Sequence, residues 1–268
     1  MALMQVEFYS ETLGFACEAN VILPQKEQGI GVTGSASAEK YPVLWLLHGA
    51  SDDHTIWLRR TSIERYVANL GLAVVMPNAH LSSYSNMAHG PQYFDFLTEE
   101  LPRVMGEFFP LSDKREDNFV CGLSMGGYGA MKLGLCCPDK YAAIGCFSAG
   151  NFVLRPKGNQ PKTARPSGGF SRNMAVFGTD DMSELQGNPE FDHFAMVEKA
   201  RAEGKELPRI FHACGTDDFL LENARQTAAW FKAQPDLEYE YHEGPGIHSW
   251  AFWDTWIQHY LTWLRQVK

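Results

Sequence analysis

The chain contains 268 residues, 45% of them hydrophobic and 13% aromatic, so it is long and apolar enough to bury a large core in one domain spanning residues 1–268. Its formal net charge of −9 argues against nucleic acid and anionic membranes as partners, because both are bound by clustered Lys and Arg. The N-terminus has neither the basic nor the apolar region of a signal peptide, and no apolar run reaches membrane-spanning length. These features predict a soluble, cytoplasmic protein.

Short apolar runs alternate with helical patterns along most of the chain. An antiparallel strand pair is expected first, at residues 6–10 and 15–23. Runs typical of buried parallel strands follow at residues 43–47, 72–76, 119–121, 143–147, 210–214 and 237–241. Helical patterns lie between them at residues 62–70, 94–109, 124–137 and 222–233, and Pro102 is expected to kink the second. This alternation predicts a mostly parallel central sheet with helices on both faces.

One segment interrupts the alternation. Residues 151–205 contain a stretch rich in Pro, Gly and Ser, followed by a helical pattern near residues 191–202. Because open α/β sheets bind ligands at the carboxyl ends of their strands, an insertion at that edge tends to form a substrate pocket. We therefore expect a small cap-like insertion over about residues 151–205. A final helix follows, with an apolar stripe that indicates core packing, formed by Trp250, Trp253, Ile257, Tyr260, Leu261 and Leu264.

The six cysteines do not have the spacing of a metal or redox site. They show no C-x-x-C pattern, and four of them lie within or beside apolar runs. We expect small core residues and no disulfide framework. The six are Cys17, Cys121, Cys136, Cys137, Cys146 and Cys214.

The pentapeptide Gly122-Leu123-Ser124-Met125-Gly126 has the pattern G-x-S-x-G between an expected strand and an expected helix. A bare match of this kind is more often a glycine-rich turn with an incidental serine, but this context favours a nucleophile. Glycines two residues before and after the serine remove side chains that would collide in a tight turn. The helix N-terminus would also stabilise developing negative charge, so Ser124 is the predicted nucleophile.

A nucleophilic serine needs a histidine to accept its proton, and in this fold the histidine follows the serine and the acid in the chain. Of the nine histidines, four precede Ser124, and most of the others fall within expected helices or strands. His248 stands alone in the Gly-rich sequence GPGIHSW, between the last strand and the last helix. A lone histidine is usually structural, but this position favours His248 as the base.

The acid has two candidate positions, because GTDD occurs at residues 178–181 and again at 215–218. The second copy directly follows a strong strand pattern and is then followed by helix, strand and His248, which is the required connection. Within it, Asp218 completes G-x-x-D and is taken as the orienting carboxylate. Asp217 is taken as a helix-start residue, a common role for Asp. The choice between these neighbours rests on local pattern alone.

Catalysis also requires N–H donors aimed at the oxyanion, each worth roughly 2.7–4 kcal/mol. Met125, the residue after the nucleophile, offers one. The other is expected from the loop after residues 43–47, with Ala50 as first choice and Ser51 as the next. Adjacent carboxylates in a loop are more often solvated or capping than metal-binding, so no metal site is predicted here. The potential ligands in this loop are His48, Asp52, Asp53 and His54.

Together these motifs resemble the esterase D branch of the α/β-hydrolases, and within it the tributyrin esterase group. The resemblance runs through PVLWLLHGASDDHTIWLRRTSIERY, YFDFLTEELPRVMGEFFP, CGLSMGGYGAMKLGL, CGTDDFLLENA and GIHSWAFWD. It implies an α/β-hydrolase fold, with Ser124, Asp218 and His248 as nucleophile, acid and base and with Trp57 near the acyl pocket. Residues 155–169 are longer and more basic than the family pattern, so the resemblance does not define the pocket's shape.

The sequence therefore predicts a serine carboxylesterase that hydrolyses small, short-chain acyl esters through an acyl-enzyme, without a cofactor. A short pocket is expected because Trp57 and Phe177, Phe191 or Phe194 would crowd its entrance. An S-formylglutathione hydrolase-type thioesterase is the nearest alternative, and an acyltransferase is a more distant one. A hydrolase-fold protein that only binds ligands is an alternative from a different class. The resemblance also suggests a homo-oligomer, either a dimer or a tetramer.

Overall fold

A computed structural model describes the chain except for residues 27, 30–31, 34–38, 155–170 and 266–268. Its centre is an eight-stranded sheet with the order β1-β2-β6-β5-β7-β8-β9-β10, and a small second sheet pairs β3 with β4. The strands are β1 (Ala2–Ser10), β2 (Phe15–Leu23), β3 (Gln28–Gly29), β4 (Val32–Thr33), β5 (Val43–Leu47), β6 (Ala73–Pro77), β7 (Asn118–Leu123), β8 (Ala143–Phe147), β9 (Arg209–Gly215) and β10 (Tyr239–Gly244).

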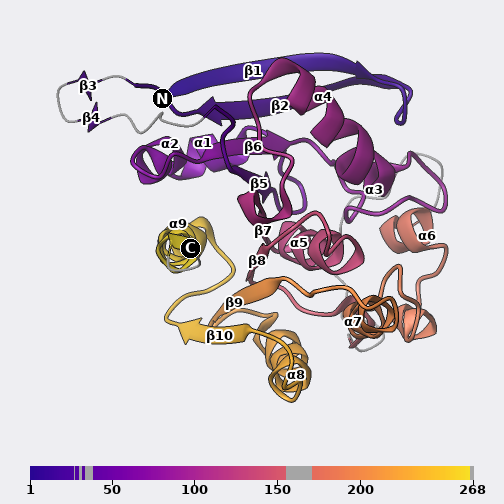
Figure 1. Cartoon of the computed structure of the whole chain (residues 1–268). Helices are drawn as coiled ribbons and strands as arrows, with labels where there is room; N and C mark the ends of the chain where they lie inside the picture. The colour runs from indigo at the N-terminus through magenta and orange to yellow at the C-terminus, as the bar shows by residue number, and fades with distance from the viewer. Residues whose placement is uncertain (27, 30–31, 34–38, 155–170, 266–268) are drawn as a thin grey trace.

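Helices cover both faces of this sheet (Figure 1). The α-helices are α1 (Ile56–Arg60), α2 (Ile63–Val67), α3 (Tyr93–Asp95), α4 (Leu101–Phe108), α5 (Met125–Cys136), α6 (Arg172–Phe177), α7 (His193–Ala202), α8 (Leu221–Lys232) and α9 (Trp250–Arg265). A π-helix, η1 (Phe96–Glu100), and the 3-10 turns η2 (Arg115–Asp117), η3 (Phe152–Leu154) and η4 (Met182–Leu185) complete the elements. Within the described ranges, no helix combines the length and apolar character needed to cross a bilayer.

The central strands are parallel and fully covered. β5 pairs in parallel with β6 and β7, and β7 through β10 continue in the same direction, whereas β1 and β2 form an antiparallel edge. Every residue of β5, β6, β7 and β8 is buried, which explains why these strands are continuous apolar runs in the sequence. β5 and β8 have the predicted bounds. β10 begins at Tyr239, two residues later than expected.

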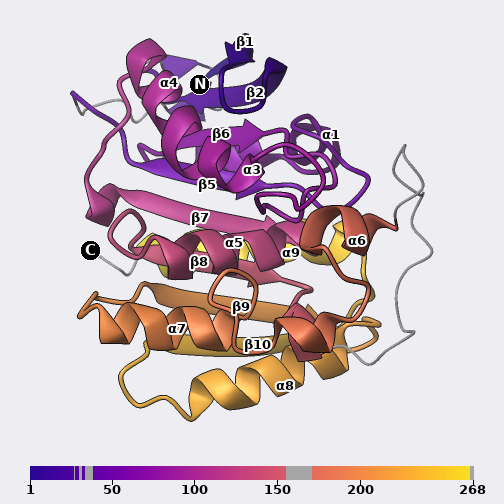
Figure 2. The same ribbon diagram turned by 90° about the vertical axis from the view of Figure 1, so that its right-hand side faces the viewer.

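Two apolar clusters lie on opposite faces of the sheet. The first joins α1, α2 and α9 to one face and includes Trp57 and Ile257. The second joins α4, α5, α7 and α8 to the other face and includes Met131 and Met196. Figures 1 and 2 show the helices in these two layers. The stripe predicted for the last helix is confirmed as buried core at Trp253, Ile257, Tyr260, Leu261 and Leu264, while Trp250 is half-buried.

The helix expected at residues 94–109 is continuous but changes type. It begins as α3, passes through the π-helix η1 and continues as α4, which has Pro102 in its first turn. Because proline has no N–H, the Thr98 carbonyl receives no hydrogen bond from the residue four positions later. The Lys140 ammonium donates to this carbonyl instead, at 2.7 Å. The structure thus places a π-helix before Pro102 where the sequence predicted a kink.

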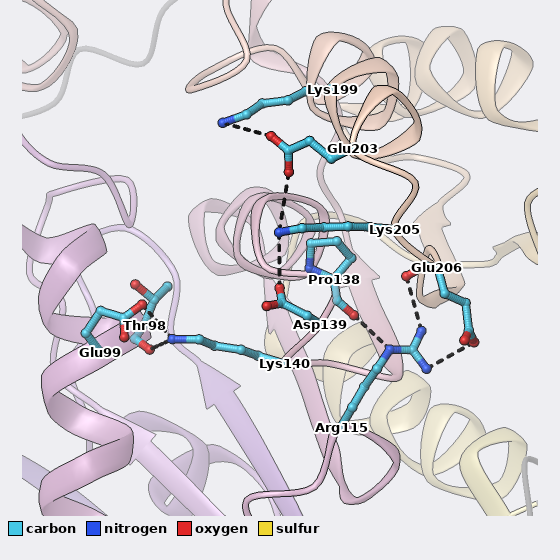
Figure 3. A network of polar contacts seen from close by, with 10 residues as sticks. All are labelled: Thr98, Glu99, Arg115, Pro138, Asp139, Lys140, Lys199, Glu203, Lys205 and Glu206. Carbon is cyan, nitrogen blue, oxygen red and sulfur yellow. Dashed lines mark hydrogen bonds and ion pairs between the residues drawn. The ribbon is translucent and has the colours of Figure 1, made fainter.

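Lys140 belongs to a polar network at the amino-terminal edge of the parallel strands (Figure 3). It pairs with Glu99 at 2.6 Å, and Arg115 donates to the Pro138 carbonyl at 2.8 Å. Exposed ion pairs contribute only about 0–1 kcal/mol each, so the main effect is to fix the loops that lead into β7, β8 and β9. The other labelled ion-pair members are Asp139, Lys199, Glu203, Lys205 and Glu206.

The insertion expected at residues 151–205 divides into two parts. α7 packs against α5 and places Met196 and Val197 in the main core, so it is a layer helix of the sheet. In contrast, η3, α6 and η4 form a separate cluster around Phe152 and Phe177, beside Tyr128 of α5. The Pro/Gly-rich part of the expected cap, residues 155–170, lies outside the described residues.

Lys132 of α5 is 3% exposed, although a buried lysine normally has an acidic partner. Its ammonium donates to the Ser85 hydroxyl at 2.8 Å and lies 4.7 Å from the centre of the Phe191 ring. Burial lowers the pKa of Lys132 from 10.5 to about 8. Between these two values the unfolded chain binds more protons than the folded protein, so this group makes the free energy of unfolding rise with pH across that window.

Lys132→Met should raise the free energy of unfolding at pH 7 by about 1–3 kcal/mol, because it removes a buried charge and keeps a similar volume. The advantage over wild type should shrink from pH 8 upward, as wild-type Lys132 loses its proton. Urea unfolding at pH 7, 8.5 and 10 measures this. Lys114→Met, at an exposed lysine, is the control and should be neutral throughout. A Lys132 variant less stable than wild type at pH 7 would contradict the expected burial cost.

Candidate active site

Ser124 lies at the turn where β7 ends and α5 begins. Its backbone has φ 52° and ψ −116°, a conformation that non-glycine residues rarely adopt. The Ser124 N–H donates to the Phe147 carbonyl at 2.8 Å, and its carbonyl accepts from the Tyr128 N–H at 3.1 Å. Both ends of the strained residue are therefore held by the sheet and by the first turn of α5.

Gly122 and Gly126 allow this turn to form. A Cβ at Gly122 would lie 2.3 Å from the Gly126 carbonyl oxygen. A Cβ at Gly126 would lie 2.6 Å from the carbonyl oxygens of Leu47 and His48. These neighbours are backbone atoms, which cannot rotate away. The expectation that the two glycines remove colliding side chains is confirmed: a side chain at Gly122 would collide with Gly126 in α5, and one at Gly126 with the end of β5.

The His248 imidazole bridges Ser124 and Asp218. Nε2 lies 2.9 Å from Ser124 Oγ, while Nδ1 lies 2.9 Å from Asp218 Oδ2 and 3.1 Å from Oδ1. A carboxylate beside Nδ1 favours the tautomer with its proton on that nitrogen, which leaves Nε2 able to accept the serine proton. The three side chains come from the ends of β7, β9 and β10, and the fold brings them together.

Asp218 has a buried carboxylate with several donors around it. Its side chain is 0% exposed, and Oδ1 accepts the Leu220 N–H at 2.8 Å. Burial raises the pKa of Asp218, but hydrogen bonds from His248, the Leu220 N–H and the Ser148 hydroxyl outweigh it, so the pKa lies below its ordinary value. The carboxylate is therefore ionised at neutral pH and holds the imidazole through a charge-assisted hydrogen bond. Nothing in the sequence marked Ser148 as a neighbour.

The loops that carry Asp218 and His248 are joined by backbone contacts. The Asp217 N–H donates to the Gly246 carbonyl at 3.0 Å. A Cβ at Gly215 would lie 2.3 Å from that same carbonyl oxygen, so the two loops can meet only because residue 215 is glycine. This contact sets the position of His248 relative to the carboxylate.

The other carboxylates considered from the sequence have different partners. Asp217 is exposed and accepts a hydrogen bond from the Thr216 hydroxyl at 3.2 Å. Asp181 caps the 3-10 turn η4 and accepts from the Ser183 N–H at 3.2 Å. Of the two GTDD copies, the second follows β9 of the central sheet. The last residue of this copy, Asp218, is buried and hydrogen-bonded to His248.

Two backbone segments lie next to the Ser124 side chain. Met125 is the first residue of α5, where N–H groups have no acceptor within the helix. On the other side, a Cβ at Gly49 would lie 3.7 Å from the Ser124 Cβ, so the loop after β5 packs against the serine. Ala50 follows directly and is half-buried. The N–H groups proposed as oxyanion donors thus belong to the two segments that adjoin the serine.

His48 supports this loop from behind, a role that its sequence context did not indicate. It is 1% exposed, and its Nδ1 donates to the Gly49 carbonyl at 2.7 Å while Nε2 accepts the Ala79 N–H at 2.9 Å. Burial lowers the pKa of His48 to about 4, so the ring is neutral at neutral pH and can donate at one nitrogen and accept at the other. The Tyr84 hydroxyl donates to the His48 carbonyl at 2.8 Å.

Two of the four residues of this loop that were considered as metal ligands, Asp53 and His48, have other partners. Asp53 accepts hydrogen bonds from the Thr55 N–H at 2.8 Å and from its hydroxyl at 2.6 Å, a local turn arrangement. His48 makes the two backbone contacts described above. Across the described part of the chain, no three His, Cys, Asp or Glu side chains are grouped as metal ligands would be.

Trp57, which was expected near the acyl pocket, is directed into the core. Its side chain is 1% exposed, its indole N–H donates to the Leu47 carbonyl at 3.0 Å, and its ring packs edge-on against Trp250. α1 turns this residue toward the sheet, so Trp57 packs behind the end of β5 as a core residue. Phe194 is also directed elsewhere, stacked on Trp230 of α8.

Apolar side chains are instead exposed beside His248. Phe219, which follows Asp218, is 67% exposed, and its ring centre lies 4.5 Å from that of His248. Ile247, which precedes the histidine, is 59% exposed. Neither residue was singled out from the sequence, because a single apolar residue in a loop carries no periodic signal.

Comparison with known proteins identifies the family. The chain matches the family described as "Putative esterase" over residues 10–264. It is also 30% identical over 269 aligned residues to an acetyl esterase of Caldicellulosiruptor saccharolyticus, with 100% of both chains covered. The chain therefore belongs to this esterase family.

Two solved structures from Staphylococcus aureus are similar over the whole chain. The substrate-bound fluorophosphonate-binding serine hydrolase FphF has a TM-score of 0.83 and 34% identity, with 100% of this chain and 98% of that chain covered. The S-formylglutathione hydrolase FrmB has a TM-score of 0.82 and 34% identity, covering 100% and 99%. The protein is thus a serine hydrolase with an α/β-hydrolase fold, as the sequence predicted, and its relatives are esterase D-like.

Gly126→Ala should lower the free energy of unfolding by about 2–4 kcal/mol, because the added Cβ would meet two backbone carbonyls. Gly106→Ala in α4 is the matched control. A Cβ there meets nothing within 4 Å, so alanine should stabilise the helix by about 0.5–1 kcal/mol. Urea unfolding of both variants measures the difference. Equal stability of the two would show that the Ser124 turn tolerates a side chain and that the packing explanation is wrong.

Proposed function

We propose that this esterase-family protein is a carboxylesterase that hydrolyses short-chain acyl esters through an acyl-enzyme on Ser124. The observation that carries the proposal is the hydrogen-bonded row of Asp218, His248 and Ser124, with the serine on a strained turn at a helix N-terminus. Side chains in this relation are the general means of activating a serine for acyl transfer. The proposed substrate is a small acyl ester, and the proposed steps use no cofactor.

In acylation, Ser124 Oγ attacks the ester carbonyl carbon while His248 Nε2 takes the hydroxyl proton. The new bond converts the carbonyl into a tetrahedral oxyanion. The N–H groups of Met125 and Ala50 receive this oxyanion, and each such donor contributes roughly 2.7–4 kcal/mol to the transition state. The bond to the alcohol oxygen then breaks, and His248 Nε2 gives its proton to the departing oxygen.

In deacylation, a water molecule replaces the alcohol. His248 Nε2 removes a proton from the water as its oxygen attacks the acyl carbon. The second tetrahedral intermediate collapses, the acid leaves, and the proton returns to Ser124 Oγ. Asp218 stays ionised and stabilises the imidazolium that forms in both steps, which its lowered pKa favours.

The position of α6 supports a short acyl pocket. The His89 N–H donates to the Ala175 carbonyl at 2.9 Å, which ties α6 to the long loop after β6. Arg172 at the start of α6 lies 2.8 Å from the sulfur of Met125, the residue that follows the proposed nucleophile. The helix therefore packs close to the reacting centre. The acetyl esterase relative is in keeping with a small acyl group.

An S-formyl thioester is a second candidate substrate, supported by the similarity to the S-formylglutathione hydrolase FrmB. The same steps apply with sulfur as the leaving atom. Comparing kcat/KM for S-formylglutathione with that for 4-nitrophenyl acetate separates the two. A value at least a hundred times higher for the thioester would make it the principal substrate.

Ser124→Ala should fold normally and lose on the order of 10⁴–10⁶ in kcat on 4-nitrophenyl acetate, because removal of the nucleophile blocks acyl-enzyme formation. A fluorophosphonate probe should label the wild type at Ser124 and leave the variant unlabelled, as read by mass spectrometry. Activity within tenfold of the wild type would rule out the proposed mechanism.

The matched controls for this prediction are the neighbouring carboxylates. Asp218→Asn should lose on the order of 10⁴ in kcat, because an amide favours the wrong imidazole tautomer. Asp217→Asn should stay within about threefold of wild type, since surface substitutions away from a site have small effects. A severe loss at Asp217 and a mild one at Asp218 would reassign the acid.

The acyl-chain preference should be short. With 4-nitrophenyl esters of two to ten acyl carbons, kcat/KM should rise while the chain fits, by the equivalent of up to about 0.8 kcal/mol of transition-state binding per methylene. It should begin to fall once the chain reaches about six carbons, because the chain then meets packed side chains. Tributyrin should be cleaved well, in keeping with the resemblance to tributyrin esterases. A kcat/KM that keeps climbing to decanoate would indicate an open groove and contradict the short pocket.

A further inference from the structure

Arg172 begins α6 and reaches back to the carboxyl edge of the sheet. Its Nη2 lies 2.8 Å from Sδ of Met125 and 3.1 Å from the Ser83 hydroxyl, and its Nε donates to the Leu81 carbonyl at 3.3 Å. Met125 directly follows Ser124, and Leu81 and Ser83 belong to the loop after β6. Figure 2 shows α6 at the end of the sheet where β7 leads into α5. The guanidinium therefore lies at the margin of the proposed active site.

The partners of this guanidinium are neutral. They are a carbonyl, a hydroxyl and a thioether, and no carboxylate of the described residues forms an ion pair with Arg172. Residues 155–170, which precede α6 in the chain, contain neither Asp nor Glu. Burial lowers the pKa of Arg172 to about 10, still well above neutral pH, so the group keeps its charge. A positive charge is thus held next to the nucleophile turn without compensation.

Arg172 is half-buried, and a charge withdrawn from water without a counter-charge opposes folding. Two other arginines of the chain have carboxylate partners. Arg201 lies 2.5 Å from Asp236, and Arg225 lies 2.7 Å from Glu243. An apolar side chain at position 172 would keep the contact with Met125 without withdrawing a charge from water. A negatively charged group on the substrate would supply the missing partner and would explain why the guanidinium has no carboxylate beside it.

We infer that Arg172 binds a carboxylate of the substrate, so that the preferred esters carry an acidic group near the scissile bond. This rests on the proposed esterase function and adds a substrate class to it. A guanidinium presents parallel N–H donors that match both oxygens of a carboxylate. The carboxylate belongs either to the acyl part or to the alcohol part, since Met125 adjoins the proposed oxyanion position between them.

Two pairs of esters that differ in one charge test the inference. 4-Acetoxybenzoate and its methyl ester differ on the alcohol side. Mono-4-nitrophenyl glutarate and 4-nitrophenyl pentanoate differ on the acyl side. The measured quantity is the ratio of kcat/KM for the charged ester to that for its neutral twin. Any general effect of a variant on the Ser124 turn cancels in this ratio, so a merely structural role of Arg172 would leave it unchanged.

Arg172→Met should lower the ratio about 100-fold for one of the two pairs, and that pair identifies the side of the ester that carries the carboxylate. Arg172→Lys should lower the same ratio about tenfold relative to wild type, because an ammonium keeps the charge but loses the paired donors. Arg103→Met is the matched control. It removes an exposed arginine of α4 that pairs with Glu107, and both ratios should stay within about twofold of wild type.

Unchanged ratios in both pairs for Arg172→Met would overturn the inference and leave Arg172 as a residue that only holds α6 against Met125. If that variant does not fold, Arg172→Lys decides by the same ratio. Failure of the esterase proposal looks different, because wild type would then cleave none of the four esters. In that case calorimetric titration with glutarate decides. Binding that Arg172→Lys weakens supports the anion site, and equal or absent binding overturns it.

Discussion

The site depends on one close backbone contact, between the Ser124 turn and the end of β5. Because Gly126 has no Cβ, the start of α5 packs directly on the carbonyls of Leu47 and His48. The contact brings the loop after β5 against the serine and keeps Ser124 in a conformation that a free chain would avoid. Burial of β5, β7 and β8 offsets the energy of that conformation, so the position of the serine hydroxyl is a property of the whole sheet.

Charged groups lie at both edges of the parallel sheet, and those beside Ser124 differ in their partners from those at the opposite edge. At the amino-terminal edge, exposed ion pairs such as Lys140 with Glu99 join the loops (Figure 3). At the carboxyl-terminal edge, His48 is neutral, Asp218 is stabilised by hydrogen bonds, and Arg172 has neutral partners. Electrostatic interactions are stronger where water is excluded, which suits the negative charge that develops in ester hydrolysis. The groups proposed to act on a substrate thus lie at the carboxyl-terminal edge, where the ion pair of Arg225 with Glu243 joins α8 to the end of β10.

The strands were the most predictable part of the fold, because parallel strands covered on both faces are continuous apolar runs. β5 and β8 have the expected bounds. β10 was placed two residues early, since it is an edge strand with half-buried side chains and its start carries no apolar signal. The short helix α1 and the π-helix η1 were not expected. Five residues are too few to show a helical period, and the π-helix precedes Pro102, whose missing N–H leaves the Thr98 carbonyl to the distant Lys140.

For the site, the sequence by itself determined the residue types and their order. A strand that turns directly into a helix needs glycines at 122 and 126, so the spacing together with the strand before it and the helix after it placed Ser124 at that turn. The tertiary structure decided which of two adjacent aspartates faces His248, because that depends on how the loop after β9 meets Gly246. It also buried Trp57 behind β5 and brought Arg172 onto Met125. Periodicity reports the burial of each element separately, whereas these positions are set by contacts between elements far apart in the chain.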